Sequence, residues 1–354
     1  MLHNGRRLGA HLPLADGLVR AADRAAATGA SAMQVFVDNP TSWRRRAALP
    51  PELPAFRDRL AALGIAPLSV HAPYLVNLAG PNEETWVRSI ELLGSELRVA
   101  AAYQAALINL HIGSHRGAGV EAGVARVADG IRRSLEAAGD DGGAVMLVLE
   151  NGAGGGYSIG STPEEIAEID RAIAALGVPP ERTGYCLDTA HLWGAGFPIG
   201  TAEGVDALLA EFDARVGLDR LRMVHLNDSR SALGSRSDQH THLGGGHIGT
   251  EGLARLLVHP GLAHTAYIIE TPGMEEGWDA VNLARARDLA AGRPLAPLPP
   301  EAFHTRSARG RGAPPETGRT VDEANDGDTD DGRHAGAEAP HAPVPVADGA
   351  AAAR

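Results

Sequence analysis

The chain alternates between short apolar runs and longer stretches of alanine and leucine with helical spacing. Eight runs, most of them rich in Val, Ile and Leu, are too short for ordinary helices and fit buried parallel strands best. They cover residues 8–12, 32–37, 67–71, 106–111, 144–150, 184–188, 221–228 and 266–270. Helical spacing is clearest at residues 17–28, 83–105, 202–216 and 250–258. Eight strand and helix units in succession predict an α/β fold, a single (β/α)8 TIM barrel.

Side chains that bind metals gather where the predicted strands end. Six of the eight strands end at or beside one of them. The full set is His71, His111, Glu150, Asp188, His191, His225, Asp238, His240 and Glu270. Because the carboxyl ends of barrel strands meet at one mouth, we expect these side chains to lie together. Buried carboxylates are costly unless a cation neutralises them, so the set predicts a polynuclear metal centre.

The spacing of two pairs supports chelation. Asp188 and His191 are three residues apart, which puts both on one face if the chain turns into a helix there. Asp238 and His240 are two residues apart, which puts both on one face of an extended segment. The donors are nitrogen and oxygen only, and they suit Zn²⁺ as well as Mn²⁺ or Fe²⁺, so spacing alone does not choose the metal.

Six segments of the chain resemble, in order, the endonuclease IV family of apurinic/apyrimidinic endonucleases, over residues 8–288. The segments are HAPYLVNLA at His71, NLHIGSH at Asn109, LENGAGGG at Leu149, CLDTAHLWGAG at Cys186, VHLNDSRSALGSRSDQHTHLGGGHIG at Val224 and IIETPG at Ile268. The resemblance implies three zinc ions per chain, with Mn²⁺ as an alternative. It assigns one ion to His71, His111 and Glu150, a second to Glu150, Asp188, His225 and Glu270, and a third to His191, Asp238 and His240.

The same resemblance implies an activity and a partner. The reaction is hydrolysis of the phosphodiester 5′ to an abasic site in double-stranded DNA, which leaves a 3′-hydroxyl and a 5′-deoxyribose phosphate. Removal of blocked 3′ ends follows from the same chemistry. Glu270 would orient or deprotonate the attacking water as well as bind metal, and Glu150 would bridge two of the ions. The family also suggests a monomer.

Contacts with DNA are less complete in this chain than in the family. The resemblance implies contacts through Asn39, Trp43, Tyr74, Leu75 and Arg236. However, Thr41 and Gln239 stand where relatives carry positively charged residues. The net charge of the whole chain is −12. We therefore expect DNA affinity to depend on a local patch and to be modest and sensitive to salt.

Two other functions compete with this interpretation. The barrel superfamily includes sugar isomerases and epimerases that use one or two divalent ions, and the third ligand group of His191, Asp238 and His240 argues against them. The losses at Thr41 and Gln239 raise the alternative of a lesion-binding protein without catalysis, against which the retained Glu270 argues. The chain contains no lysine, and a Schiff-base lyase needs an amine nucleophile, so that route to strand cleavage is disfavoured.

Composition changes near residue 293. Residues 294–354 are rich in Pro, Ala and acids, with an acidic cluster between Asp322 and Asp331, and predict a disordered tail after a catalytic domain of residues 1–293. Cys186 is the only cysteine, which excludes an internal disulfide. No signal peptide or membrane-spanning apolar run is recognisable, so we expect a cytoplasmic protein without a membrane partner.

Overall fold

The computed structural model describes residues 1–305 and has eight parallel strands closed into a barrel. The strands are β1 (Arg7–His11), β2 (Ala32–Val35), β3 (Leu68–His71), β4 (Leu107–His111), β5 (Met146–Glu150), β6 (Thr183–Asp188), β7 (Leu221–His225) and β10 (Ala266–Ile269). They are hydrogen-bonded in the order β1-β10-β7-β6-β5-β4-β3-β2, which returns to β1. Each of the eight predicted strands is present, so the predicted TIM barrel is confirmed.

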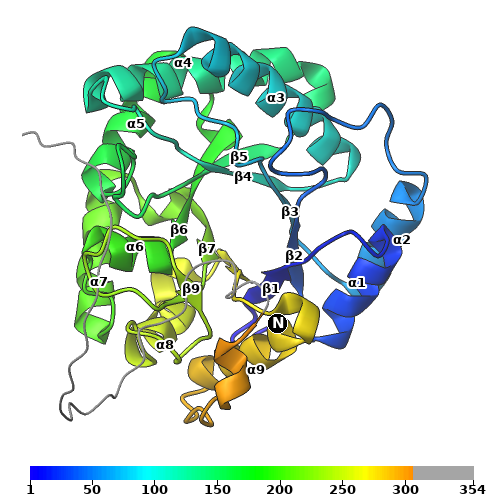
Figure 1. The fold of residues 1–354 in the computed structure, drawn as a ribbon, viewed down its shortest axis with the longest axis vertical. Helices are drawn as coiled ribbons and strands as arrows, with labels where there is room; N and C mark the ends of the chain where they lie inside the picture. Colours follow the sequence, from blue (N-terminus) through cyan, green and yellow to red (C-terminus); the bar gives the residue numbers. More distant parts are fainter. Residues whose placement is uncertain (306–354) are drawn as a thin grey trace, which may run out of the picture. The chain divides into compact units, whose positions relative to one another are not determined.

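Helices surround the barrel, as Figure 1 shows in a view along its interior. Within residues 1–305 they are α1 (Leu18–Ala27), α2 (Leu53–Leu63), α3 (Glu83–Ala102), α4 (Val120–Ala138), α5 (Pro163–Ala175), α6 (Thr189–Ala195), α7 (Ala202–Arg215), α8 (Glu251–Val258) and α9 (Trp278–Ala290). The four helices expected from their spacing correspond to α1, α3, α7 and α8. Over the same residues, no helix combines the length and apolar character that crossing a membrane requires.

The inside of the barrel consists of an apolar layer with a polar layer above it. The apolar layer contains Ala32, Leu107, Val148, Cys186, Met223 and Ile268, all buried. Because strand side chains alternate between the two faces, the residue two positions after each of these also points inward. Those positions hold Gln34, Asn109, Glu150, Asp188, His225 and Glu270. The polar layer therefore lies at the carboxyl ends of the strands, on an apolar floor.

A short antiparallel hairpin stands outside the barrel between β7 and α8. Its strands are β8 (Asp228–Ser229) and β9 (His240–Thr241), and Ser229 is paired with His240. The buried Asp228 carboxylate accepts hydrogen bonds from the backbone of Gly246 (3.1 Å) and Ile248 (3.0 Å), which ties the chain after β9 to the start of β8. Sequence analysis placed residues 221–228 in one strand, whereas the structure ends β7 at His225 and starts the hairpin at Asp228.

The packed part of the chain extends past the domain boundary expected at residue 293, so that boundary is placed too early. A one-turn helix at Pro300–Phe303 buries Ala302 completely. His242, just after β9, has its Nε2 2.7 Å from the Ala302 carbonyl oxygen, and Arg285 of α9 donates to the Ala296 carbonyl (2.6 Å). Residues 294–305 therefore belong to the barrel domain. The disordered tail was predicted for residues 294–354, and its larger part, residues 306–354, lies outside the described residues.

Truncation tests this corrected boundary. A chain that ends at Arg293 leaves His242 Nε2 without the Ala302 carbonyl and Arg285 Nη1 without the Ala296 carbonyl, and it uncovers the site of Ala302. Each buried polar group left without a partner costs about 1–3 kcal/mol, so we expect this truncation to melt several degrees lower than the full chain. A control chain that ends at Ala313 should melt with the full chain. Equal melting temperatures for both truncations would restore the boundary at residue 293.

Candidate metal centre

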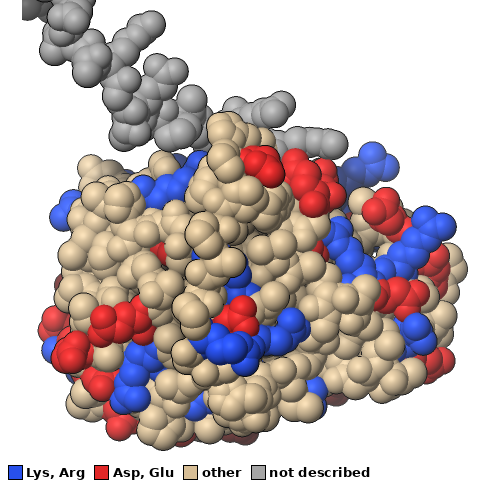
Figure 2. All heavy atoms as spheres, turned by 90° about the horizontal axis from the view of Figure 1, so that it is seen from below, with Lys and Arg blue, Asp and Glu red and all other residues tan. Residues whose placement is uncertain are grey.

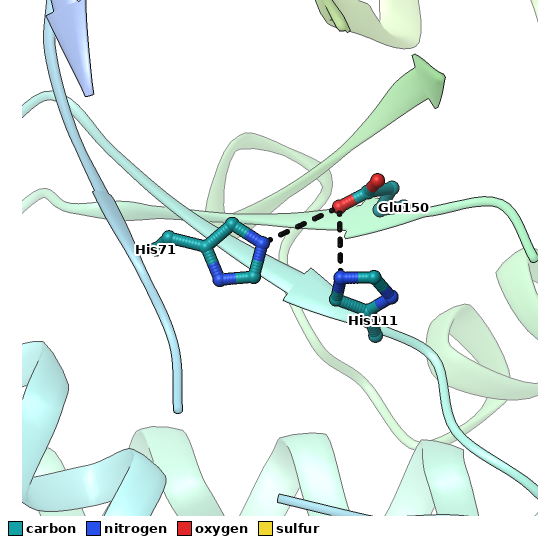
Figure 3. Close-up of side chains that lie close together, drawn as sticks. All are labelled: His71, His111 and Glu150. Atoms are coloured by element: carbon teal, nitrogen blue, oxygen red, sulfur yellow. Dashed lines mark ion pairs between the residues drawn. The ribbon is translucent and has the colours of Figure 1, made fainter. Parts of the chain in front are cut away.

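The first ligand group lies at the ends of β3, β4 and β5. The Nε2 atoms of His71 and His111 lie 3.7 and 3.6 Å from the same oxygen of Glu150, Oε2. Figure 3 shows both rings directed at this carboxylate, with dashed lines to the shared oxygen. Neither contact is close enough for a good hydrogen bond, and the three donor atoms surround one point.

A second group joins the ends of four strands at the centre of the mouth. His225 Nδ1 lies 3.2 Å from Glu150 Oε1, 3.2 Å from Glu270 Oε2 and 3.9 Å from Asp188 Oδ2. Glu150 thus belongs to the first and the second group through different oxygens. The structure thus places the Glu150 carboxylate between the first and the second group.

The third group combines α6 with the hairpin. His191 Nε2 lies 3.3 Å from Asp238 Oδ2, and His240 Nε2 lies 3.0 Å from Asp238 Oδ1 and 3.4 Å from Asp188 Oδ2. Asp188 caps α6 by accepting from the backbone of His191 (2.8 Å), which is the turn into helix expected from their spacing. The mutually close donor atoms of this group belong to Asp188, His191 and His240, whereas Asp238, which the resemblance assigned here, contacts both histidines but lies outside that closest set.

Hydrogen bonds to the backbone fix which nitrogen three of the histidines present to the centre. The Nδ1 atoms of His71, His191 and His240 lie 2.7, 2.9 and 3.3 Å from the carbonyl oxygens of Ala72, Asn151 and Glu270. A proton on Nδ1 satisfies each carbonyl and leaves Nε2 with a lone pair that faces the carboxylates. His225 is turned the other way, since its Nε2 lies 3.2 Å from Gln34 Oε1 and its Nδ1 faces the centre.

Opposite charges stabilise one another in the centre in spite of burial. Burial opposes ionisation of Glu150, but the adjacent His111 and His225 hold its pKa well below its usual range. Burial likewise opposes ionisation of Asp188, while His191 and His240 keep its pKa low. Asp188 and Asp238 in turn raise the pKa of His191 to about 10 against the effect of burial. The carboxylates are therefore anionic and draw positive charge to this site.

These donor atoms fit divalent ions. In each of three groups, one donor atom per residue lies within 4.8 Å of all the others. Tetrahedral ligands about 2.1 Å from a zinc ion are roughly 3.4 Å apart, close to the separations in the first group. In addition, the buried His240 Nε2 has no hydrogen-bond partner among residues 1–305, although the Asp238 oxygen is only 3.0 Å away. A nitrogen in that position suits metal ligation better than hydrogen bonding.

Several polar residues that sequence analysis did not single out support the ligands. Gln34 of β2 donates to Glu270 Oε1 (2.8 Å), and His11 of β1 lies 3.2 Å from the same oxygen. Asn109 donates to Glu150 Oε2 (2.5 Å), and Asn227 donates to Asp188 Oδ2 (2.7 Å). The sequence could have indicated Gln34, because it is a polar residue inside an apolar run that was predicted to be a strand buried on both faces.

The ligands open into a cavity of about 630 Å³ whose wall contains one of the expected DNA contacts. Tyr74 lines the cavity with its side chain 59% exposed, and its ring packs against Phe36 (5.3 Å between centroids). Leu75 is half-buried beside it and does not line the cavity. The mouth therefore carries an aromatic side chain directly above the first ligand group, where Tyr74 approaches His111 (6.0 Å).

The other expected DNA contacts lie outside the cavity wall. Asn39 is exposed, and its Oδ1 accepts from the backbone and hydroxyl of Thr41 (3.0 and 2.9 Å). Trp43 is half-buried, with the Arg88 guanidinium 4.4 Å from its ring centroid. Arg236 is exposed and has a left-handed backbone with φ of 56°. These three residues therefore lie at or near the surface and do not line the cavity.

Comparisons with known proteins agree with this geometry. Residues 22–291 match the xylose isomerase-like TIM barrel family. A probable endonuclease 4 of Methanoculleus marisnigri is 42% identical over 283 residues, which are 80% of this chain and 98% of the relative. A probable endonuclease 4 of Chloroflexus aurantiacus is 40% identical over 287 residues, which are 81% and 99% of the two chains.

Solved structures give the same relationship. The crystal structure of endonuclease IV from Thermus thermophilus is 38% identical, has a TM-score of 0.69, and is matched over 81% of this chain and 99% of that one. A D-tagatose 3-epimerase-like protein is 18% identical with a TM-score of 0.57, over 81% and 96% of the chains, and shares the fold alone. This chain is a member of the endonuclease IV family of enzymes, built on the xylose isomerase-like TIM barrel.

Proposed function

We propose that this protein hydrolyses the phosphodiester 5′ to an abasic site in duplex DNA, with three divalent ions, chiefly zinc, held by the three ligand groups. The observation that carries the proposal is the convergence of these groups on one mouth, with Glu150 shared by two of them. The products would be a 3′-hydroxyl and a 5′-deoxyribose phosphate. Removal of blocked 3′ ends would use the same site. The protein would act as a monomer in the cytoplasm.

Divalent ions held by the three ligand groups would supply Lewis acidity, which makes water a better nucleophile at neutral pH and offsets negative charge on the phosphate. The remaining chemistry belongs to this chain. Glu270 is held through Oε1 by Gln34 and His11, which leaves Oε2 near His225 to accept a proton from the attacking water. Tyr74, exposed at the mouth, would stack on a base or fill the gap left by the missing base.

A sugar isomerase or epimerase is the alternative that the shared fold supports. Two ligand groups at the strand ends would suffice for such an enzyme. The third group argues against it, because Asp238 and His240 come from the hairpin and lie 3.0 Å apart beside His191. A sugar enzyme of this barrel has no need for that group.

The decisive experiment incubates purified protein of measured metal content with a duplex that carries one abasic-site analogue. We expect a single cut 5′ to the lesion with a 3′-hydroxyl end, and no cut in the matched intact duplex. A second duplex with a blocked 3′ end tests the end-cleaning activity. Failure to cut the abasic duplex, together with turnover of an open-chain sugar, would replace this proposal with the isomerase.

A further inference from the structure

DNA approaches this mouth against an unfavourable background of charge. The cavity is lined by the carboxylates of Asp238, Glu270, Glu275 and Glu276, which repel a phosphodiester that enters. On the side of the molecule drawn in Figure 2, Arg side chains alternate with acidic ones in small groups and do not form one extended positive surface. A cation at the mouth itself would therefore have a large effect on DNA binding.

Arg230 is the one arginine among the described residues that line the cavity. Its backbone is fixed by the hairpin, because it follows Ser229 of β8 and its N–H donates to the Gln239 carbonyl (3.0 Å). Gln239 in turn precedes His240, a residue of the third ligand group. The hairpin therefore holds the Arg230 side chain at the wall, close to the ligands.

The guanidinium of Arg230 offers donors that the protein does not use. Its Nε is buried and has no hydrogen-bond partner among residues 1–305. The Asp238 carboxylate in the same wall contacts His191 and His240 rather than Arg230. A buried donor without an acceptor is unfavourable, and a guanidinium fork matches the oxygens of a phosphate.

We propose that Arg230 binds a backbone phosphate of the DNA strand that carries the abasic site, beside the third ligand group. This inference rests on the proposed function and adds a substrate-binding residue to it. Arg230 would also supply positive charge at the mouth. It lies across the hairpin from Gln239, one of the two positions where relatives carry a positively charged residue and this chain does not. Arg230 would contact DNA phosphate and not the metal ions.

The first test is Arg230→Gln, which removes the charge and keeps a polar side chain. Affinity for the nicked product duplex, which cannot be cut again, is measured over a series of salt concentrations. We expect the Kd to rise roughly 10- to 100-fold, as for loss of a hydrogen bond to a charged group. The slope of log affinity against log salt should fall by about 0.9, which corresponds to one phosphate contact. Metal content and melting temperature should not change.

Two further variants separate the charge from the shape of the guanidinium. Arg230→Lys keeps the charge, so the salt slope should return to the wild-type value while the affinity recovers only in part. The matched control is Arg215→Gln at the end of α7, where Arg215 pairs with Glu211 (2.9 Å) on an exposed helix surface. That control should bind with wild-type affinity and slope.

Neutral methylphosphonate linkages, placed one at a time, identify the phosphate. At one linkage near the lesion, the neutral substitution should weaken DNA binding by the wild type. The same substitution should not weaken binding by Arg230→Gln any further, because that variant has already lost the contact. If wild type cuts abasic DNA while Arg230→Gln keeps the wild-type affinity and salt slope, Arg230 does not bind phosphate. If wild type neither binds nor cuts, the proposed function itself is overturned, and this inference with it.

Discussion

Replacing Glu270 by Gln should lower the turnover of abasic DNA by at least about 100-fold, because the side chain keeps its size but loses its charge and basicity. Glu270 lies just past the end of β10, and Gln34 donates to its Oε1 (2.8 Å) while its Oε2 faces His225 (3.2 Å). The carboxylate is thus held at Oε1 by Gln34, while Oε2 faces the ligand centre, where the attacking water would be activated. Turnover is measured with saturating abasic duplex, and metal content is measured on the same sample.

DNA binding should survive this change, since Glu270 contributes negative charge at the mouth and repels phosphate. The matched control is Glu211→Gln on the exposed surface of α7, which should cut at the wild-type rate. Cleavage by Glu270→Gln at the parental rate, with its metals still bound, would contradict the role proposed for Glu270. A loss of metal together with activity would instead make Glu270 chiefly a ligand.

Elemental analysis of active protein should find about three divalent ions per chain, and their removal should lower its stability. Glu150 and Asp188 are 1% and 0% exposed, so without cations the only positive charges beside them among the described residues are those of protonated histidines. A ligand present at about 1,000 times its Kd stabilises a fold by about 4 kcal/mol, which corresponds to a melting shift of roughly 10 °C. Thermal unfolding before and after chelation measures the shift.

A single-residue change tests whether the third ligand group holds its own ion. His240→Ala should lower the ion content from about three to about two, because the other two groups do not use this residue. The control His304→Ala changes an exposed histidine outside the centre and should leave the content unchanged. One ion or none in active protein, or an identical melting temperature without metal, would refute the trinuclear arrangement.

The barrel and most of its ligands were predictable because both follow from local patterns. Apolar runs of strand length indicated the eight strands, and His71, His111, Glu150, Asp188 and His225 are the last residues of their strands in the structure. A residue at the carboxyl end of a barrel strand points to the mouth when it falls on the inward face of that strand. The positions of these five residues at the ends of predicted strands were therefore enough to predict that their side chains lie together.

Other features depend on contacts between distant parts of the chain, which no local pattern reports. Residues 294–305 have the composition of a linker, yet they pack because His242 and Arg285, earlier in the chain, meet their carbonyl oxygens. The position of Arg230 at the cavity could not be predicted from the sequence for the same reason, since it depends on how the two strands of the hairpin pair. Gln34 was missed because it bears no ligand chemistry of its own.

The hairpin has a consequence for how new activities arise on this barrel. Strands of the closed sheet carry the first two ligand groups, whereas β8, β9 and the chain between them supply Asp238, His240 and Arg230. Because the hairpin is joined to the barrel only between β7 and α8, evolution can lengthen, shorten or replace it while the strands keep their register. The barrel strands and the hairpin can therefore change separately, and grafting the hairpin onto another barrel of this fold would test whether it transfers the third ligand group.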